Sequence, residues 1–190
     1  IPLISYPLII NRIGLISFGE LALLQAIFGI SSVFNVFGTN YTAVRSISLN
    51  KNNNRILSNI IISTLFIRLT NLIISVSLIV LLNFVFSFSE NIDLVFFSIG
   101  FIAFEAFVPT WYYQGFEKIF RLSVFNLFIK TSYLLIIYLF LNESNIELVP
   151  KAMLIPTLFV SIYTVVIILS THVSFKFLKI GIIVSLNTVS

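Results

Sequence analysis

Residues 56–86 read ILSNIIISTLFIRLTNLIISVSLIVLLNFVF, a stretch with one charged side chain, Arg68. A helix needs about 20 apolar residues to cross a hydrocarbon core about 30 Å thick, so this stretch predicts a membrane span. It is long for a single crossing, and we expect it to tilt or to emerge from the bilayer. Its apolar run lacks the period-2 alternation of barrel strands. The stretch therefore favours an all-α, polytopic membrane protein.

The composition of the 190-residue chain agrees with this interpretation. Hydrophobic residues make up 58% of it and charged residues 9%, whereas a soluble domain averages about 25% charged residues. The 21 Phe residues exclude a disordered chain, which would be poor in aromatics. Without Cys and with one His, the chain can form neither disulfides nor thiolate metal sites. The net charge of +4 is scattered among apolar segments, so we expect no nucleic-acid partner and no cofactor.

Further apolar stretches on both sides of residues 56–86 predict one truncated helix and four more full spans. In chain order, the predicted spans are 1–10 (partial), 21–44, 56–86, 94–113, 124–141 and 149–170. The short connections leave no room for a soluble domain. Both ends of the chain fall in apolar stretches, so we expect a fragment of a larger membrane protein.

The Lys and Arg residues collect in alternate connections. Loops 45–55, 114–123 and 171–180 hold seven of them, against Arg12 and Lys151 in the other connections. Those other connections carry acidic residues instead, namely Glu20, Glu90, Asp93, Glu143 and Glu147. Because Lys and Arg accumulate in short cytoplasmic loops, we predict that the three basic loops are cytoplasmic.

Polar residues recur at helical spacing inside the spans and mark faces turned away from lipid. Three of them are ionisable, and their spacing puts all three about 9–18 Å from the cytoplasmic ends of their spans. A charge near mid-bilayer costs several kcal/mol unless it is paired or hydrated, so we predict an inward-open, water-filled cavity. The residues predicted to line it and to bind substrate are Arg68, Lys130, Glu105, Asn35, Asn71, Asn126 and Tyr133.

A structural alternative stays open for these residues. Small and hydroxyl side chains also pack membrane helices together, and Glu105 can form an ion pair with Arg68 or Lys130. Such a pair would still leave one positive charge over, which suits an anionic substrate. The sequence has no paired catalytic carboxylates, phosphate-binding glycine loop or metal-ligand spacing, so we expect a protein that is not an enzyme.

Three local patterns resemble a known family. Gly38-Thr39-Asn40-Tyr41-Thr42-Ala43-Val44-Arg45-Ser46-Ile47-Ser48 resembles the Gly-Phe-Asn-x-Ser-Ala-Thr-Arg-x-Ile-Ser stretch of bacterial polysaccharide (O-antigen) flippases. Pro109-Thr110-Trp111-Tyr112-Tyr113-Gln114-Gly115-Phe116-Glu117-Lys118 resembles the Pro-x-Trp-x-Phe-Gln-Gly-x-Glu-Lys loop of that family, with Tyr113 in place of Phe. Pro7, Gly14 and Phe18-Gly19 are similar to its first periplasmic turn, although the family's Arg three places before the Gly is Asn11 here.

The resemblance implies a twelve-helix transporter of two six-helix lobes, of which this chain would be most of the N-terminal lobe. It implies translocation of an undecaprenyl-diphosphate-linked oligosaccharide, an O-antigen or related repeat unit, from the cytoplasmic to the periplasmic leaflet of the bacterial inner membrane. The implied partners are the lipid-linked substrate, the bilayer, H⁺ or Na⁺ as coupling ion, and a polysaccharide polymerase with its chain-length regulator. The implied process is lipopolysaccharide biosynthesis.

Two other functions remain open. A multidrug or small-molecule exporter of the same superfamily would share the fold, and the cavity lining alone does not separate the two. A membrane polysaccharide polymerase would need a large outer loop carrying catalytic residues, and the outer loops of this chain are short.

Overall fold

The computed structural model describes residues 2–36, 38–86, 91–142 and 145–172 of the chain. These residues form helices and short connections, with no strand among them. Most of the predicted basic loop 171–180, with Lys176 and Lys179, lies outside the described residues, as do Glu90 and Glu143.

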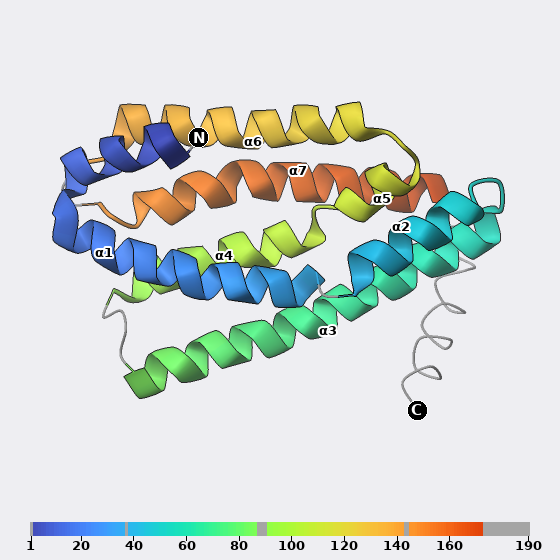
Figure 1. Ribbon diagram of the computed structural model, residues 1–190, viewed down its shortest axis with the longest axis horizontal. Coiled ribbons are helices and arrows are strands. Elements are labelled where there is room, and N and C mark those ends of the chain that lie inside the picture. Colours follow the sequence, from blue (N-terminus) through green and yellow to red (C-terminus); the bar gives the residue numbers. More distant parts are fainter. Residues whose placement is uncertain (1, 37, 87–90, 143–144, 173–190) are drawn as a thin grey trace.

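In this part of the chain the helices are α1 (Pro2–Val36), α2 (Thr39–Leu49), α3 (Asn54–Phe86), α4 (Ile92–Phe107), α5 (Thr110–Gly115), α6 (Ile119–Phe140) and α7 (Leu148–His172). The long helices lie side by side in one bundle (Figure 1). α7 packs against both α4 and α6, α1 contacts α3, α4 and α6, and α2 packs against α3 and α5.

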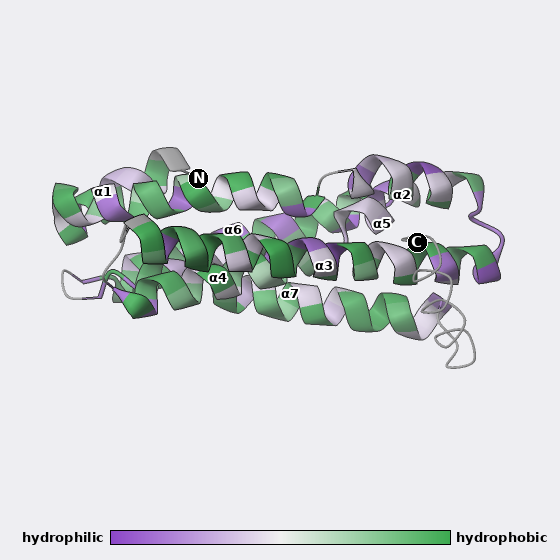
Figure 2. Cartoon of the chain, turned by 90° about the horizontal axis from the view of Figure 1, so that it is seen from below, coloured by the Kyte–Doolittle hydropathy of each residue, from purple (hydrophilic) through white to green (hydrophobic). Residues whose placement is uncertain are grey.

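Five stretches of the described residues are long and apolar enough to cross a membrane. These candidate spans are Ile4–Leu49, Asn54–Val85, Ile92–Gly115, Ile119–Phe140 and Leu148–His172. Apolar residues continue over the outer faces of the helices (Figure 2), and side chains such as Ile16 and Phe84 are almost fully exposed. Such faces are suited to lipid. The prediction of an all-α, multi-pass membrane protein is confirmed, whereas membership of a twelve-helix, two-lobe transporter stays a prediction.

The predicted span 94–113 is divided in two by a break at Val108 and Pro109. Proline disfavours helical conformation in the residue before it, and Val108 is extended, with φ −64° and ψ 114°. α4 therefore ends at Phe107, and the chain begins a second, six-residue helix, α5, at Thr110. Hydropathy alone could not locate this break, because both halves are apolar.

The predicted spans 1–10 and 21–44 also differ from the observed helices. α1 runs through both predicted segments with a kink at Gly14, which divides it into a short limb (residues 2–13) and a long limb (residues 15–36). Gly38, with φ 72°, then separates α1 from α2. The short limb is fixed to α6 by Arg12, which donates to the carbonyls of Leu141 at 2.8 Å and Tyr138 at 3.2 Å.

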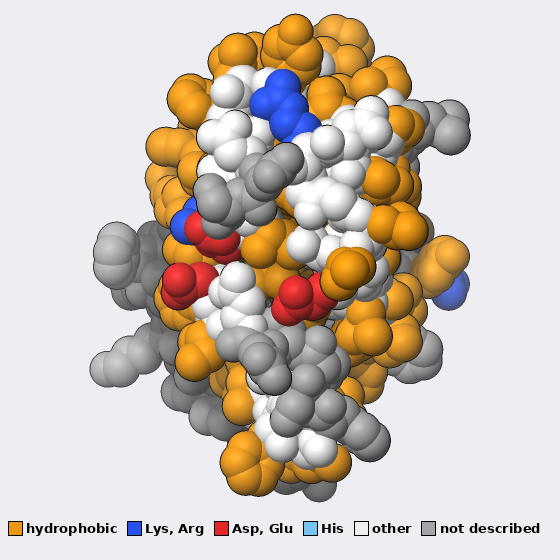
Figure 3. All heavy atoms as spheres, turned by 90° about the vertical axis from the view of Figure 1, so that its left-hand side faces the viewer, with side chains coloured by type: hydrophobic (Ala, Val, Ile, Leu, Met, Phe, Trp, Pro, Cys, Tyr) orange, Lys and Arg blue, Asp and Glu red, His pale blue; other side chains and the backbone are white. Residues whose placement is uncertain are grey.

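Charged residues separate to the two ends of the bundle. The α2–α3 and α5–α6 connections lie together and form a basic end, which contains Arg45, Lys51, Arg55, Lys118 and Arg121. The other end, where α6 ends and α7 begins, carries Asp93 and Glu147, and also Arg12 and Lys151; Figure 3 shows both red acidic and blue basic side chains on it. This is the alternation that the sequence predicts, although which end faces the cytoplasm stays a prediction.

The Gly14 kink gives a first test of the fold. Gly14 has φ 81° and ψ 167°, a conformation essentially reserved for glycine. We expect Gly14→Ala to lower the free energy of unfolding by about 1–3 kcal/mol. Thermal unfolding of the full-length protein in detergent would measure the change. Gly19→Ala is the matched control, because Gly19 is helical and an added Cβ meets nothing within 4 Å. Equal melting temperatures for the two variants would contradict the kink.

Candidate functional site

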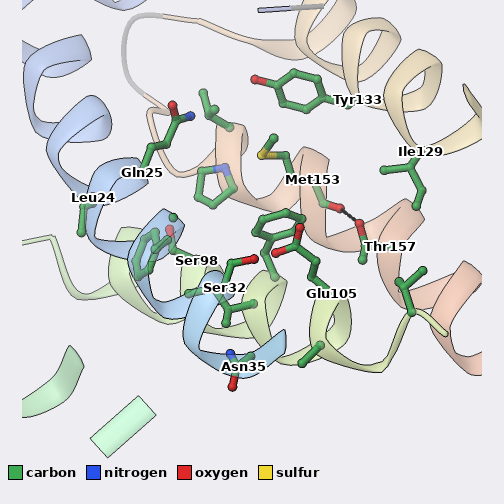
Figure 4. Close-up of a pocket in the computed structure, with 18 of the residues that line it drawn as sticks. Leu24, Gln25, Ser32, Asn35, Ser98, Glu105, Ile129, Tyr133, Met153 and Thr157 are labelled. Atoms are coloured by element: carbon green, nitrogen blue, oxygen red, sulfur yellow. Dashed lines mark hydrogen bonds between the residues drawn. The ribbon is translucent and has the colours of Figure 1, made fainter. Parts of the chain in front are cut away.

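A cavity of about 720 Å³ lies between the long limb of α1, α4, α6 and α7. Its volume is within the usual range for small-molecule sites, about 300–1,000 Å³. Figure 4 shows Gln25 and Ser32 from α1, Glu105 from α4, Tyr133 from α6 and Thr157 from α7 around the same space. The cavity thus collects polar side chains from the inward faces of several apolar helices, within a lining that is mainly apolar.

Six of the seven predicted site residues line this cavity: Arg68, Lys130, Glu105, Asn35, Asn126 and Tyr133. Asn71 does not. α3 packs against α1 and α4, and among the described residues its contribution to the lining is the long side chain of Arg68. Asn71 lies one turn further along α3 with a shorter side chain. Whether the six lining residues bind substrate stays a prediction.

Arg68 is 2% exposed. Its guanidinium group makes two hydrogen bonds to main-chain carbonyls and one to a side chain, and its Nε has no partner among the described residues. Its Nη1 donates to the carbonyl oxygens of Ala106 at 2.7 Å and Val108 at 3.4 Å, and its Nη2 donates to Asn40 Oδ1 at 2.6 Å. The guanidinium carbon also lies 5.9 Å from the ring centre of Trp111. Arg68 therefore supplies a donor to the Ala106 carbonyl, which loses its helical partner at the break before Pro109, and a second, longer bond to the Val108 carbonyl, which also accepts from the Thr110 N–H at 2.9 Å.

The predicted alternative of an ion pair for Glu105 is absent from the described residues. There the ion pairs are Lys51–Glu117 and Lys151–Glu147. Glu105 on α4 and Lys130 on α6 both line the cavity and are both exposed, so they present one carboxylate and one ammonium from different walls. The sequence predicted one positive charge more than negative charge in the lining. Arg68 supplies that extra charge, and its hydrogen bonds go to carbonyl oxygens of the protein.

The rest of the lining is of mixed character. Phe28 and Phe101 supply aromatic surface, and Met153 on α7 lies near Glu105 and Thr157 (Figure 4). Asn35 is 2% exposed, accepts a hydrogen bond from Ser75 at 3.3 Å and has an Nδ2 without a partner. No group of three or more His, Asp and Glu residues that could hold a metal ion occurs within the described ranges. The cavity is thus equipped for hydrogen bonding and charge pairing with an amphiphilic ligand.

The two longer patterns in the sequence, 38–48 and 109–118, form α2 and α5 and pack against each other. Lys51 Nζ lies 2.7 Å from Glu117 Oε1 at the solvent edge of this contact. The hydrogen bond from Lys51 and its charge hold the pKa of the Glu117 carboxyl below its usual value. Arg68 connects this α2–α5 unit to the cavity through Asn40 and Val108.

Comparison of the chain with protein-family models, with curated proteins and with solved structures finds no match. The resemblance to flippases consequently rests on the sequence patterns. The lining also includes polar residues that the predicted site omitted, among them Asn40, Ser32, Gln25 and Thr157. Asn40 lies inside the first pattern and Ser32 lies one turn before Asn35, so the signals were position in a motif and helical spacing.

Proposed function

We propose that this chain forms part of a transporter that moves a lipid-linked oligosaccharide across the bacterial inner membrane, from the cytoplasmic to the periplasmic leaflet. The observation that carries the proposal is the cavity of about 720 Å³ inside a bundle of membrane-length apolar helices, with Lys130 and several uncharged polar side chains in its lining. The helices α2 and α5, which carry the two longer flippase-like patterns, pack against each other, and this contact supports the resemblance to the flippase family.

In this proposal the lipid tail stays in the bilayer and the sugar-diphosphate head group enters the cavity. Lys130 and Asn126, one turn apart on α6, would replace water around the diphosphate. Glu105 or another group would couple the movement to H⁺ or Na⁺, and rocking of this helix bundle against a second lobe would alternate access. The basic end would face the cytoplasm.

Replacing Lys130 by Gln tests the proposal. We expect the initial rate of translocation to fall about tenfold, because a hydrogen bond to a charged group contributes about 1.5–3 kcal/mol. The rate is measured with the full-length protein in proteoliposomes and a fluorescent undecaprenyl-diphosphate disaccharide, counting molecules that reach the opposite leaflet. Arg121→Gln is the matched control, because Arg121 lies on the same helix at the basic end, away from the cavity lining.

A multidrug or small-molecule exporter is the second candidate, and the aromatic and aliphatic part of the lining favours it. Phe28, Phe101 and Met153 would suit an apolar drug, which needs no diphosphate contact. Drug efflux from the same proteoliposomes, with no movement of the disaccharide lipid, would replace the proposed function by this one. A rate of disaccharide translocation that is equal for Lys130→Gln and wild type would contradict the role of Lys130.

A further inference from the structure

The charged groups that the cavity offers to a ligand are one anion and one cation. Arg68 is committed to the carbonyls of Ala106 and Val108 and to Asn40. Glu105 and Lys130 are the other two charged residues of the lining, and within the described residues neither is in an ion pair. The bound ligand therefore faces a free carboxylate as well as a free ammonium.

The two charges stand on different walls. Glu105 projects from α4 and Lys130 lines the cavity from α6, and α7 packs against both helices between them. Met153 and Thr157 of α7 line the cavity near Glu105 (Figure 4). A ligand that contacts both Glu105 and Lys130 must carry a positive and a negative charge at separate positions. A single small ion cannot contact both groups in this way.

The surroundings of Glu105 suit an ammonium group. The hydroxyl of Ser32 on α1 lies on the side of the cavity toward which the Glu105 carboxylate points (Figure 4). Phe28 and Phe101 line the same α1–α4 side of the cavity, and aromatic faces attract cations. A carboxylate at membrane depth costs several kcal/mol unless it is paired or hydrated, so a ligand cation would remove a cost that Ser32 alone does not.

We propose that Glu105 binds a free amine of the transported head group, so that the cavity selects zwitterionic lipid-linked sugars. The anionic diphosphate would lie at Lys130 and a protonated amino sugar at Glu105. This inference rests on the proposed function and adds the substrate class to it. N-acetylation converts the amine to an uncharged acetamide and leaves the sugar ring and its hydroxyls unchanged.

A matched pair of ligands tests the inference. The probes are undecaprenyl-diphosphate disaccharides that carry a 2-amino sugar in the free or the N-acetylated form. Binding to the full-length protein in nanodiscs is measured at about pH 6.5, where an amine with a pKa of about 8 is protonated. We expect the free amine to bind about tenfold more tightly than its N-acetylated form, as for a partly desolvated ion pair. In Glu105→Gln this preference should vanish.

The control variants separate the possible outcomes. Glu147→Gln removes a carboxylate that lies just before α7, outside the cavity lining, and pairs with Lys151 at 3.8 Å, and it should keep the preference for the amine. Lys130→Gln should weaken the binding of both forms equally. Equal affinity of the wild type for both forms, or a preference that survives in Glu105→Gln, would overturn the role of Glu105 while leaving the flippase proposal intact. If neither form bound to the wild type, the proposed function itself would be rejected.

Discussion

We expect Arg68→Met to lower the free energy of unfolding of the full-length protein by about 3–5 kcal/mol. Met fills a similar length but donates no hydrogen bond, so the carbonyls of Ala106 and Val108 and the amide oxygen of Asn40 lose their guanidinium donor. These groups lie where α4 stops before Pro109, and membrane surroundings offer them no water. The measurements are the melting temperature in detergent and the amount of folded protein in the membrane.

Three comparisons make this prediction specific. Arg45→Met removes an exposed Arg on α2 and should change the free energy of unfolding by no more than about 0.5 kcal/mol. Arg68→Lys should be intermediate, because an ammonium can reach one carbonyl but lacks the planar fork of Arg. Normal stability of Arg68→Met together with lost translocation would show that Arg68 contacts substrate, as the sequence predicted, and that its bonds to carbonyls matter little.

The long helices were predictable because hydropathy measures their length directly. The predicted spans 56–86, 124–141 and 149–170 correspond to α3, α6 and α7 with ends shifted by a few residues. Helical spacing was equally informative for the cavity: Asn126, Lys130 and Tyr133 recur at steps of four and three on α6, and all three reach the lining. Periodicity identifies the inward face of a helix without any knowledge of its neighbours.

The breaks and the partners were not predictable in the same way. Pro109 is visible in the sequence, but the carbonyls that it frees become partners for Arg68 only when α2, α3 and α4 meet. Asn71 lies one turn from Arg68 on the same polar face of α3. The shorter Asn71 side chain does not line the cavity, whereas the longer Arg68 side chain does. Such differences depend on side-chain length and on which helices pack against each other. The packing cannot be read from the sequence of one segment.

The contact between α2 and α5 gives the second large effect, through Gly115. A Cβ added at Gly115 would lie 2.8 Å from both Cβ and Cγ2 of Ile47 and 3.3 Å from the carbonyl oxygen of Val44. Ile47 is fully buried and β-branched, so its Cβ cannot move without its helix. We expect Gly115→Ala to push α5 away from α2 and to lower the free energy of unfolding by about 3 kcal/mol, at the upper end of overpacking effects.

Gly100→Ala separates this clash from the general effect of adding a methyl group inside the bundle. A Cβ at Gly100 would approach Leu154 Cδ1 to 2.5 Å, but the next atom, Cγ, is 3.8 Å away. A rotation of the Leu154 side chain relieves that contact, so the cost should stay below about 1 kcal/mol. Thermal unfolding of both variants in the same detergent measures the difference. Equal destabilisation of the two variants would mean that α5 can shift freely on α2. The α2–α5 unit would then not hold Arg68 in a fixed position relative to the cavity.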